Sequence, residues 1–381
     1  MEMNALGWQA KIVTLIFLLS LLLLTVLLLH RHPQPFHPVI GDGVTGPQGM
    51  AWIPGGEFLM GSSSRLARNN EKPAHRVKVD GFWMDQTDVT NAQFAAFVKA
   101  TGYVTTAEQK PDWETLKVQL PPGTPRPPEK KLLAGAMVFV GTAKPVPLDN
   151  AARWWKFVPG ANWRHPQGPG SDLQGKENYP VVQVSYVDAQ AYAQWVGKRL
   201  PTEAEWEFAA RGGLEQADYV WGNEYQPQGK SMAQTFAGKQ FPVVEPEYKA
   251  KIATVPVASY PPNGYGLYDM AGNAWQWVAD WYRADAFVLA AKNAVSGNPQ
   301  GPEVSFDPSH ADTPFDAPKR VIRGGSFLCD PQFCMSYRPS ARRGVDPYNP
   351  MSHISFRLVM GALFKEQTTS VTRTKQLSSL S

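Results

Sequence analysis

Residues 197–207 read GKRLPTEAEWE and contain the end of one predicted helix and the start of the next. Gly197 is typical of the position just past a helix, because glycine readily adopts the left-handed conformation that ends many helices. Thr202, with a glutamate three residues later, has the capping pattern that begins a helix. We predict one helix that starts at Ser185 and ends at Gly197, and another that runs from Thr202 to Arg211.

The same signals occur elsewhere in the chain. Thr90, with a glutamine three residues later, predicts a third helix that ends before Gly102. Strand-like runs rich in β-branched or alternating apolar residues lie at 57–60, 75–79 and 181–184. Short helices and strands that are joined by irregular segments predict an α+β fold.

The composition predicts one large, loop-rich domain, which we assign to residues 49–362. The chain is 43% hydrophobic and has 13 tryptophans, enough for a large core, while 32 glycines and 34 prolines favour irregular connections. Residues 110–178 show no sustained period and predict a long irregular excursion of the kind that often has a function. The net charge of +4 is small and the basic residues are dispersed, so we predict no nucleic-acid partner.

The N-terminus contains an apolar run that predicts a transmembrane helix within residues 1–30. The run Ile12–Leu29 would span about 27 Å as a helix, close to the thickness of a bilayer core. No small-residue cleavage site follows it, so we predict an uncleaved signal anchor that leaves the large domain on the extracytoplasmic, periplasmic side. Residues 31–48, rich in proline and glycine, predict a linker, and the polar residues 363–381 predict a disordered tail.

The two cysteines of the chain, Cys329 and Cys334, lie close together in the sequence. Two thiols at this spacing are compatible with a small structural disulfide, with a dithiol that cycles between redox states, or with a pair of ligands for a soft cation such as Cu(I). The spacing alone leaves these alternatives open.

Five stretches that occur in order between residues 49 and 360 point to a known family. They read MAWIPGGEFLMG at 50–61, GANWRHP at 160–166, GKRLPTEAEWE at 197–207, NGYGLYDMAGNAWQW at 263–277 and RGGS at 323–326. Together they resemble the formylglycine-generating enzymes, the sulfatase-modifying factor family. The resemblance implies an irregular, loop-rich fold that is related to C-type lectin-like domains.

The resemblance also implies a copper-dependent oxidase. Cys329 and Cys334 match the family's Cu(I) ligands, and two thiolates leave room on the metal for a substrate thiolate. The implied reaction uses dioxygen to convert a cysteine in an unfolded sulfatase segment, Cys-x-Pro-x-Arg, to formylglycine. Ser326 and Trp275 match active-site residues of the family. The alternatives are a hydroxyl that bonds the local backbone for Ser326, and a core or cleft-wall residue for Trp275.

Two charged residues match positions with a substrate-binding role. Asp112 aligns with the carboxylate that receives the substrate arginine, and Arg342 aligns with an arginine that follows the second cysteine. The alternatives are a solvated acid for Asp112 and a structural ion-pair partner for Arg342.

One calcium site of the family matches four residues of this chain: Asp269, Gly272, Ala274 and Gln276. Gln276 replaces the usual glutamate, which removes one charge and should weaken binding. We predict that a second family site is lost, because Lys249 stands where an acid is needed.

Several departures from the family pattern concern the site and the client. Asp330 and Phe333 replace a histidine and a tyrosine between the cysteines, and the family's structural disulfide positions are occupied by residues such as Ala193 and Ala210. Two alternative functions are an oxidase of the same fold that acts on another substrate, such as a peptide siderophore precursor, and a non-catalytic module that binds protein or sugar. The cysteine pair argues against the binding module.

Overall fold

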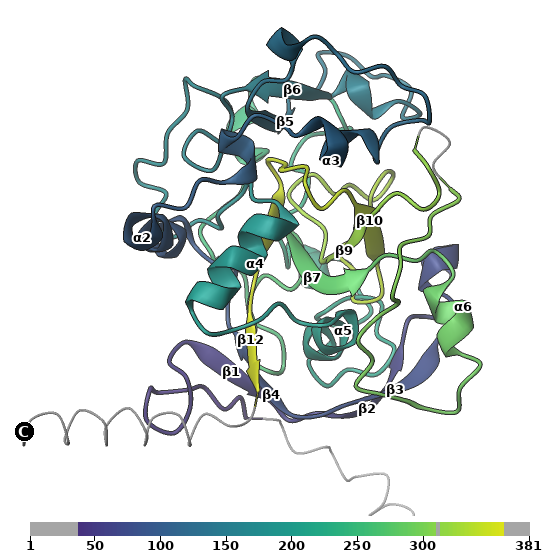
Figure 1. Ribbon diagram of the computed structural model, residues 1–381. Helices are drawn as coiled ribbons and strands as arrows, with labels where there is room; N and C mark the ends of the chain where they lie inside the picture. Colours follow the sequence, from purple (N-terminus) through teal and green to yellow (C-terminus); the bar gives the residue numbers. More distant parts are fainter. Residues whose placement is uncertain (1–36, 310–312, 362–381) are drawn as a thin grey trace, which may run out of the picture. The chain divides into compact units, whose positions relative to one another are not determined.

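The computed structural model describes residues 37–309 and 313–361, and from Pro38 onward these residues belong to one compact unit (Figure 1). The predicted transmembrane helix at 12–29 and the predicted tail at 363–381 lie outside the described residues. Within the described part of the chain, no helix is both long and apolar enough to cross a membrane.

The domain begins earlier than the sequence predicts. The Trp52 backbone N–H donates to the carbonyl of Val39, and the Gly41 N–H donates to the carbonyl of Met50, each at 2.8 Å. These hydrogen bonds attach residues 39–41 to the first strand of the domain. The predicted linker at 31–48 is therefore too long at its C-terminal end.

All three predicted helix starts are confirmed. Each helix has a complete capping box, formed by Thr90 with Gln93, Ser185 with Asp188, and Thr202 with Glu205. Gly102 and Gly212 end two of them in the left-handed conformation, with φ of 68° and 56°. The helices are α2 (Asn91–Thr101), α3 (Trp113–Lys117), α4 (Tyr186–Trp195), α5 (Glu203–Arg211) and α6 (Ala286–Ala290), with short 3-10 helices at Asn69–Glu71, Thr106–Glu108, Glu129–Lys131, Ala151–Arg153, Pro227–Gly229 and Lys249–Lys251.

The strands form several small sheets, as expected for an α+β fold with short elements. The central sheet has the order β10-β9-β7-β11, in which β11 runs parallel to β7 and the other pairs are antiparallel. The other sheets have the orders β1-β4-β12, β2-β3-β8 and β5-β6. The strands are β1 (Met50–Ile53), β2 (Gly56–Met60), β3 (His75–Val79), β4 (Phe82–Asp85), β5 (Gly135–Phe139), β6 (Trp155–Pro159), β7 (Trp275–Trp281), β8 (Ser296–Gly297), β9 (Arg320–Arg323), β10 (Arg342–Val345), β11 (Ile354–Phe356) and β12 (Val359–Gly361).

Two of the predicted strand runs are confirmed as β2 and β3, but the third, at 181–184, is wrong. Gln183 has a left-handed backbone, with φ of 61°, which no regular strand residue adopts. Its side-chain Nε2 donates to the carbonyl of Pro166 at 2.8 Å. The apolar neighbours are buried as predicted, in a connection that leads into α4.

The predicted excursion at 110–178 contains α3 and the antiparallel hairpin β5-β6. In Figure 1 the hairpin and α3 lie at the top of the view, beyond the end of the β7-β9-β10 sheet. Trp154, which precedes β6, contacts Phe333 in the segment that contains the cysteines.

Candidate active site

A tight turn after β9 positions the cysteine segment. Gly324 and Gly325 have φ of 91° and 72°, which favour glycine. A Cβ on Gly325 would lie 2.8 Å from the carbonyl carbon of Ser336, so no larger residue fits without a shift. The turn is also bonded to the 269–276 loop, because the N–H of Gly272 donates to the Gly324 carbonyl at 2.9 Å.

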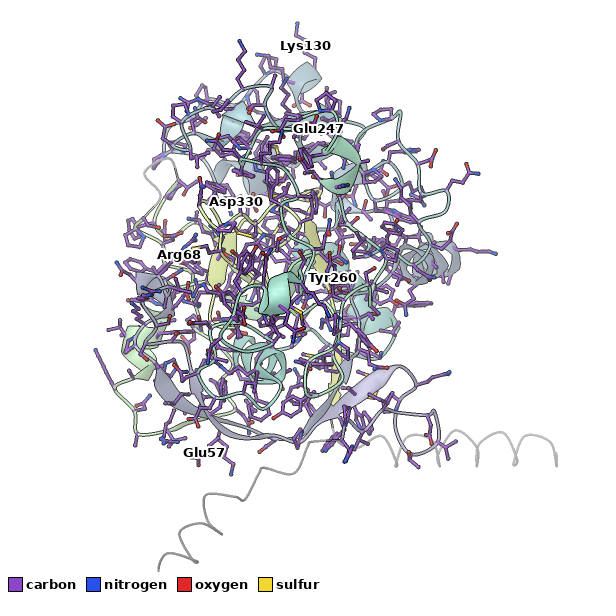
Figure 2. The ribbon with its side chains drawn as sticks, turned by 180° about the vertical axis from the view of Figure 1, so that it is seen from behind. Glu57, Arg68, Lys130, Glu247, Tyr260 and Asp330 are labelled. Atoms are coloured by element: carbon purple, nitrogen blue, oxygen red, sulfur yellow. A yellow bond between two sulfur atoms is a disulfide. The ribbon has the colours of Figure 1, made fainter. Side chains whose placement is uncertain are left out.

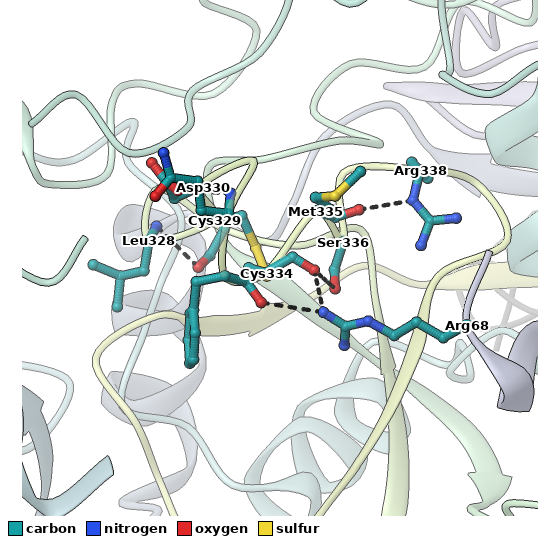
Figure 3. The surroundings of a disulfide bond; sticks show 11 residues. Arg68, Leu328, Cys329, Asp330, Cys334, Met335, Ser336 and Arg338 are labelled. Carbon is teal, nitrogen blue, oxygen red and sulfur yellow. Dashed lines mark hydrogen bonds between the residues drawn. A yellow bond between two sulfur atoms is a disulfide. The ribbon is translucent and has the colours of Figure 1, made fainter. Parts of the chain in front are cut away.

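Cys329 and Cys334 are joined by a disulfide within one short turn, with their Cα atoms 4.7 Å apart (Figure 3). We call residues 329–334 the cysteine turn. Both cysteines are buried, with 1% and 5% of their surface exposed. Asp330 caps the turn: its Oδ1 accepts from the Gln332 N–H at 2.8 Å, and its carbonyl accepts from the Cys334 N–H at 3.0 Å. The residue that replaces the family histidine therefore stabilises the turn.

An aromatic cluster supports the cysteine turn. The ring of Phe333 stacks on Phe241, with centroids 4.4 Å apart, and Trp154 meets Phe333 edge-on at 5.7 Å. Trp155, on β6, lies 4.7 Å from the ring of His353. The excursion thus contributes rings next to the cysteine turn, and Phe333 has a packing partner in place of the hydroxyl contacts that a tyrosine would make.

Ser326 and Trp275, the other two predicted catalytic residues, are both buried. The Ser326 Oγ accepts from the Leu328 N–H at 3.2 Å, and its carbonyl accepts from the Cys329 N–H at 2.9 Å. The hydroxyl oxygen thus bonds the local backbone, and the predicted catalytic role of Ser326 stays a prediction. Trp275 begins β7 with 3% of its surface exposed, and its N–H donates to the His353 carbonyl at 2.9 Å.

Arg68 holds the cysteine turn from a distant part of the chain. Its Nη2 donates to the carbonyl of Cys334 at 2.6 Å and to that of Phe333 at 3.2 Å (Figure 3). Figure 2 shows Arg68 and Asp330 near one another on one side of the molecule. A guanidinium that bonds two successive carbonyls fixes the end of the turn that carries Cys334.

Buried ion pairs connect the strands below the cysteine turn to α5. Arg323, the last residue of β9, donates to Glu203 at 2.6 Å and to Glu207 at 2.7 Å. Arg342 binds Glu203 through two hydrogen bonds of 2.6 and 2.7 Å, and its Nη1 donates to the Arg283 carbonyl at 2.8 Å. Burial alone would raise the pKa of Glu203, but Arg342 and Arg323 hold it below its usual value.

This network bears on the two roles considered for Arg342, a substrate contact and a structural ion pair. Its donors are engaged with Glu203 and a backbone carbonyl, and 1% of its surface is exposed. Arg342 thus makes the structural ion pair that was its alternative, and its predicted substrate contact stays a prediction.

Asp112 lies on the surface as the N-cap of α3. Its Oδ2 accepts from the N–H and the hydroxyl of Thr115, at 2.9 and 3.0 Å, and these hydrogen bonds lower the pKa of its carboxyl. In the part of the chain that the structure describes, no hydrogen bond joins Asp112 to the cysteine turn. Its predicted substrate contact stays a prediction.

Two of the four predicted calcium ligands, Gln276 and Asp269, make hydrogen bonds with protein groups. Gln276 Oε1 accepts from Trp206 Nε1 at 2.7 Å and from Arg357 Nε at 2.9 Å. Its Nε2 donates to the carbonyl of Asp269 at 2.8 Å, and the Asp269 Oδ2 accepts from the Ala258 N–H at 2.8 Å. Both the oxygen and the nitrogen of the Gln276 amide are thus bonded to protein groups, so this side chain does not fit the role of a calcium ligand.

The region of the second family site is also held by amide donors. Gln234 Nε2 donates to the carbonyls of Lys251 and Ala253, at 2.9 and 3.0 Å. Gln234 Oε1 accepts from the hydroxyl of Tyr260 at 3.0 Å.

We therefore expect a calcium chelator to leave the melting temperature of the protein unchanged. In contrast, Gln276→Glu replaces the donor that faces Asp269 with a second acceptor, and should lower the melting temperature when calcium is absent. Added calcium should restore part of the loss in this variant, because a ligand that binds the native state stabilises it. A drop of the wild-type melting temperature on chelation would show that the loop binds calcium after all.

Sequence reasoning missed several residues that shape this site: Arg68, Glu203, Glu207, Arg323, Arg343 and His353. Glu203 and Glu207 lie in the quoted stretch at 197–207, and their polar character in a helix with a buried Trp206 was a usable signal. No sequence motif marks Arg68 or His353 as part of the site. Both reach it through contacts with residues that are distant in the sequence.

Comparisons with known proteins agree with this geometry. Residues 39–362 match the family model of the sulfatase-modifying factor enzyme 1-like domain. The chain is 44% identical to a formylglycine-generating enzyme of Mycobacterium tuberculosis, over 81% of this chain and 96% of that protein. It is 43% identical to a formylglycine-generating enzyme of Thermomonospora curvata, over 81% of this chain and 92% of that protein.

Two further comparisons concern a third relative and a solved structure of the same fold. The chain is 35% identical to a mouse protein named inactive C-alpha-formylglycine-generating enzyme 2, over 82% of this chain and 86% of that protein. The solved structure of PvdO from Pseudomonas aeruginosa, 24% identical, has the same fold, with a TM-score of 0.50 over 86% of this chain and 99% of PvdO. The sequence matches and the cysteine turn lead to one conclusion: this chain belongs to the formylglycine-generating enzyme family, the sulfatase-modifying factors.

Proposed function

We propose that this protein oxidises a cysteine in a Cys-x-Pro-x-Arg segment of client sulfatases to Cα-formylglycine. In this reaction one Cβ–H bond and the Cβ–S bond of the client break, an aldehyde forms at Cβ, and the sulfur leaves as hydrogen sulfide. Dioxygen is the oxidant; it takes two electrons from the client and two from a thiol reductant. The observation that carries the proposal is the pair of buried cysteines on one turn. Arg68 donates to the Cys334 carbonyl, and Phe333 of the same turn stacks on Phe241.

The cysteine pair also supports copper as the cofactor. After reduction of the disulfide, Cys329 and Cys334 would supply two thiolates from one turn, which is the soft donor set that Cu(I) prefers. Copper bound there would supply the redox chemistry that activates dioxygen beside the client thiolate. The protein's own contribution is to hold the two sulfur atoms in place through Asp330 and Arg68, and to keep bulk water away through the rings of Phe333 and Trp154.

We expect the reduced protein to bind about one Cu(I) per chain, because two thiolates make one soft site. Competition with a coloured Cu(I) chelator measures the affinity. Cys329→Ser and Cys334→Ser should each lose tight binding, while Gln332→Ala, an exposed residue of the same turn, should retain it. Equal affinity in all these proteins would make the pair a structural disulfide.

Production of a sulfatase client together with this protein tests the proposed function in cells. We expect the client cysteine to be converted to formylglycine, as seen in the mass of the peptide that contains the segment, and the client to gain sulfatase activity. If the client keeps its cysteine although the wild-type protein is produced and folded, this protein is an inactive family member or an oxidase of another substrate.

The N-terminal segment supports a separate proposal on location. The apolar run at 12–29 predicts a membrane anchor, with the catalytic domain on the extracytoplasmic side. Extraction of membranes with alkaline carbonate tests this: an anchored protein stays in the pellet, whereas removal of residues 1–36 should release it.

A further inference from the structure

Arg343, on β10, has a guanidinium group without a protein acceptor. Its Nε is buried and makes no hydrogen bond, and Arg343 takes part in no ion pair within residues 37–309 and 313–361. The preceding residue, Arg342, is bonded twice to Glu203. Because arginine stays protonated in proteins, a guanidinium whose Nε is buried without an acceptor is unfavourable. Such a group indicates a place where an external acceptor binds.

Arg343 lies between two parts of the candidate active site. On one side its charge acts on Arg68, whose Nη2 donates to the Cys334 carbonyl at 2.6 Å. On the other side its charge acts on His353, whose carbonyl accepts from the Trp275 N–H at 2.9 Å. The backbone pairing agrees with this, because Arg343 pairs with Ile322 of β9, the strand that leads into the cysteine segment.

The positive charge at this place is not neutralised by the described residues. Burial, and then the charge of Arg68, lower the pKa of Arg343 to about 10. Glu71 acts on both arginines, but its carboxylate oxygens are bonded to Arg338 at 2.6 Å each. His353 does not compensate this charge either. Burial, followed by the charge of Arg343, lowers the pKa of His353 to about 3, so its ring is neutral.

The chemistry of these groups favours a carboxylate. The planar guanidinium matches the two oxygens of a carboxylate, and hydrogen bonds between two charged groups are stronger than neutral ones. The Nδ1 of His353 is also buried without a partner among the described residues, and adds a second polar atom beside Arg343. A client polypeptide brings carboxylates as the side chains of aspartate and glutamate.

We propose that Arg343 binds a carboxylate of the client polypeptide near its reacting cysteine, and that the protein thereby selects clients with an acidic residue at that position. The proposal rests on the proposed function, because it places the client at the cysteine turn. It adds a specificity that the segment Cys-x-Pro-x-Arg does not contain.

A peptide series measures this selectivity. Each peptide contains Cys-x-Pro-x-Arg, with one glutamate placed in turn at the positions beside the cysteine, and each has a partner peptide with glutamine there. We expect wild-type protein to convert one glutamate peptide with a kcat/KM about 10-fold higher than its glutamine partner, or more. Arg343→Met should abolish that ratio, and Arg343→Lys should retain part of it. Arg126→Met removes an exposed arginine and should leave the ratio intact.

Binding of fluorescent peptides, measured without copper, separates this proposal from the proposed function. If no peptide is converted, but the glutamate peptide binds more tightly than its partner and loses this advantage in Arg343→Met, the carboxylate site stands and the oxidase assignment fails. If peptides are converted and bound without any preference for glutamate, or if Arg343→Met keeps the preference, the carboxylate site is refuted. Amidated and free C-termini in the series distinguish a side-chain carboxylate from a terminal one.

Discussion

Replacement of Cys334 by serine should reduce the conversion of a Cys-x-Pro-x-Arg peptide by at least about 100-fold. Serine is close to cysteine in size, so the turn capped by Asp330 should persist, but its hydroxyl is a poor ligand for a soft cation. Cys329→Ser should have the same effect, since one remaining thiolate does not make the site. Capture of the aldehyde product with a hydrazide reagent measures the rate.

Two controls keep this result interpretable. Gln332→Ala changes an exposed residue of the same turn and should keep wild-type conversion, and circular dichroism should show that both serine variants are folded. If either serine variant retains conversion near the wild-type rate, the cysteine pair has no part in the reaction.

Replacement of Glu203 by glutamine should lower the free energy of unfolding by about 3–5 kcal/mol. Glu203 is the carboxylate that Arg342 shares with Arg323, and all three side chains are almost completely buried. The substitution leaves the guanidinium of Arg342 without a negative partner in the core. Urea unfolding, followed by tryptophan fluorescence at fixed redox conditions, gives the free energy.

An exposed ion pair provides the matched control. Glu114 pairs with Lys117 on the surface of α3, and Glu114→Gln should change the free energy of unfolding by no more than about 0.5 kcal/mol. A similar small effect for Glu203→Gln would mean that the buried network does not stabilise the fold.

The same network predicts how stability changes in acid. The pKa of Glu203 in the folded protein lies below its ordinary value of 4.5 because of Arg342 and Arg323, despite burial. Its contribution is therefore complete above pH 4.5 and is lost as the pH falls through the lower folded pKa. We expect the contribution of Glu203, measured as the difference in unfolding free energy between wild type and Glu203→Gln, to shrink below about pH 4.5.

The sequence predicted the parts of the fold that depend on local interactions. The capping boxes at Thr90, Ser185 and Thr202 need only residues within one helical turn, so the pattern was sufficient. The strand at 181–184 failed because its burial pattern also suits a buried connection, and only the tertiary contacts of Gln183 impose its left-handed backbone.

The candidate site shows the same division between local and distant contacts. The cysteine turn was visible as a pair of residues, but Arg68 reaches it from 266 residues away in the sequence. Arg342 and Arg343 are neighbours in β10, and the alternation of a strand sends their side chains to opposite faces. The sequence alone could not tell which of them enters the ion-pair network. Likewise, Gln276 is bonded to Trp206 and Arg357, which are distant in the sequence. The sequence therefore could not show that the Gln276 side chain is already engaged.

The most direct measurement of the proposed activity uses purified components. Wild-type protein is reduced, loaded with Cu(I), and incubated with dioxygen, a thiol reductant and a Cys-x-Pro-x-Arg peptide. We predict that the peptide loses its thiol and gains an aldehyde, and that this conversion requires copper and both Cys329 and Cys334. A peptide whose thiol stays intact, with copper bound tightly to the two cysteines, would contradict the sulfatase-modifying function.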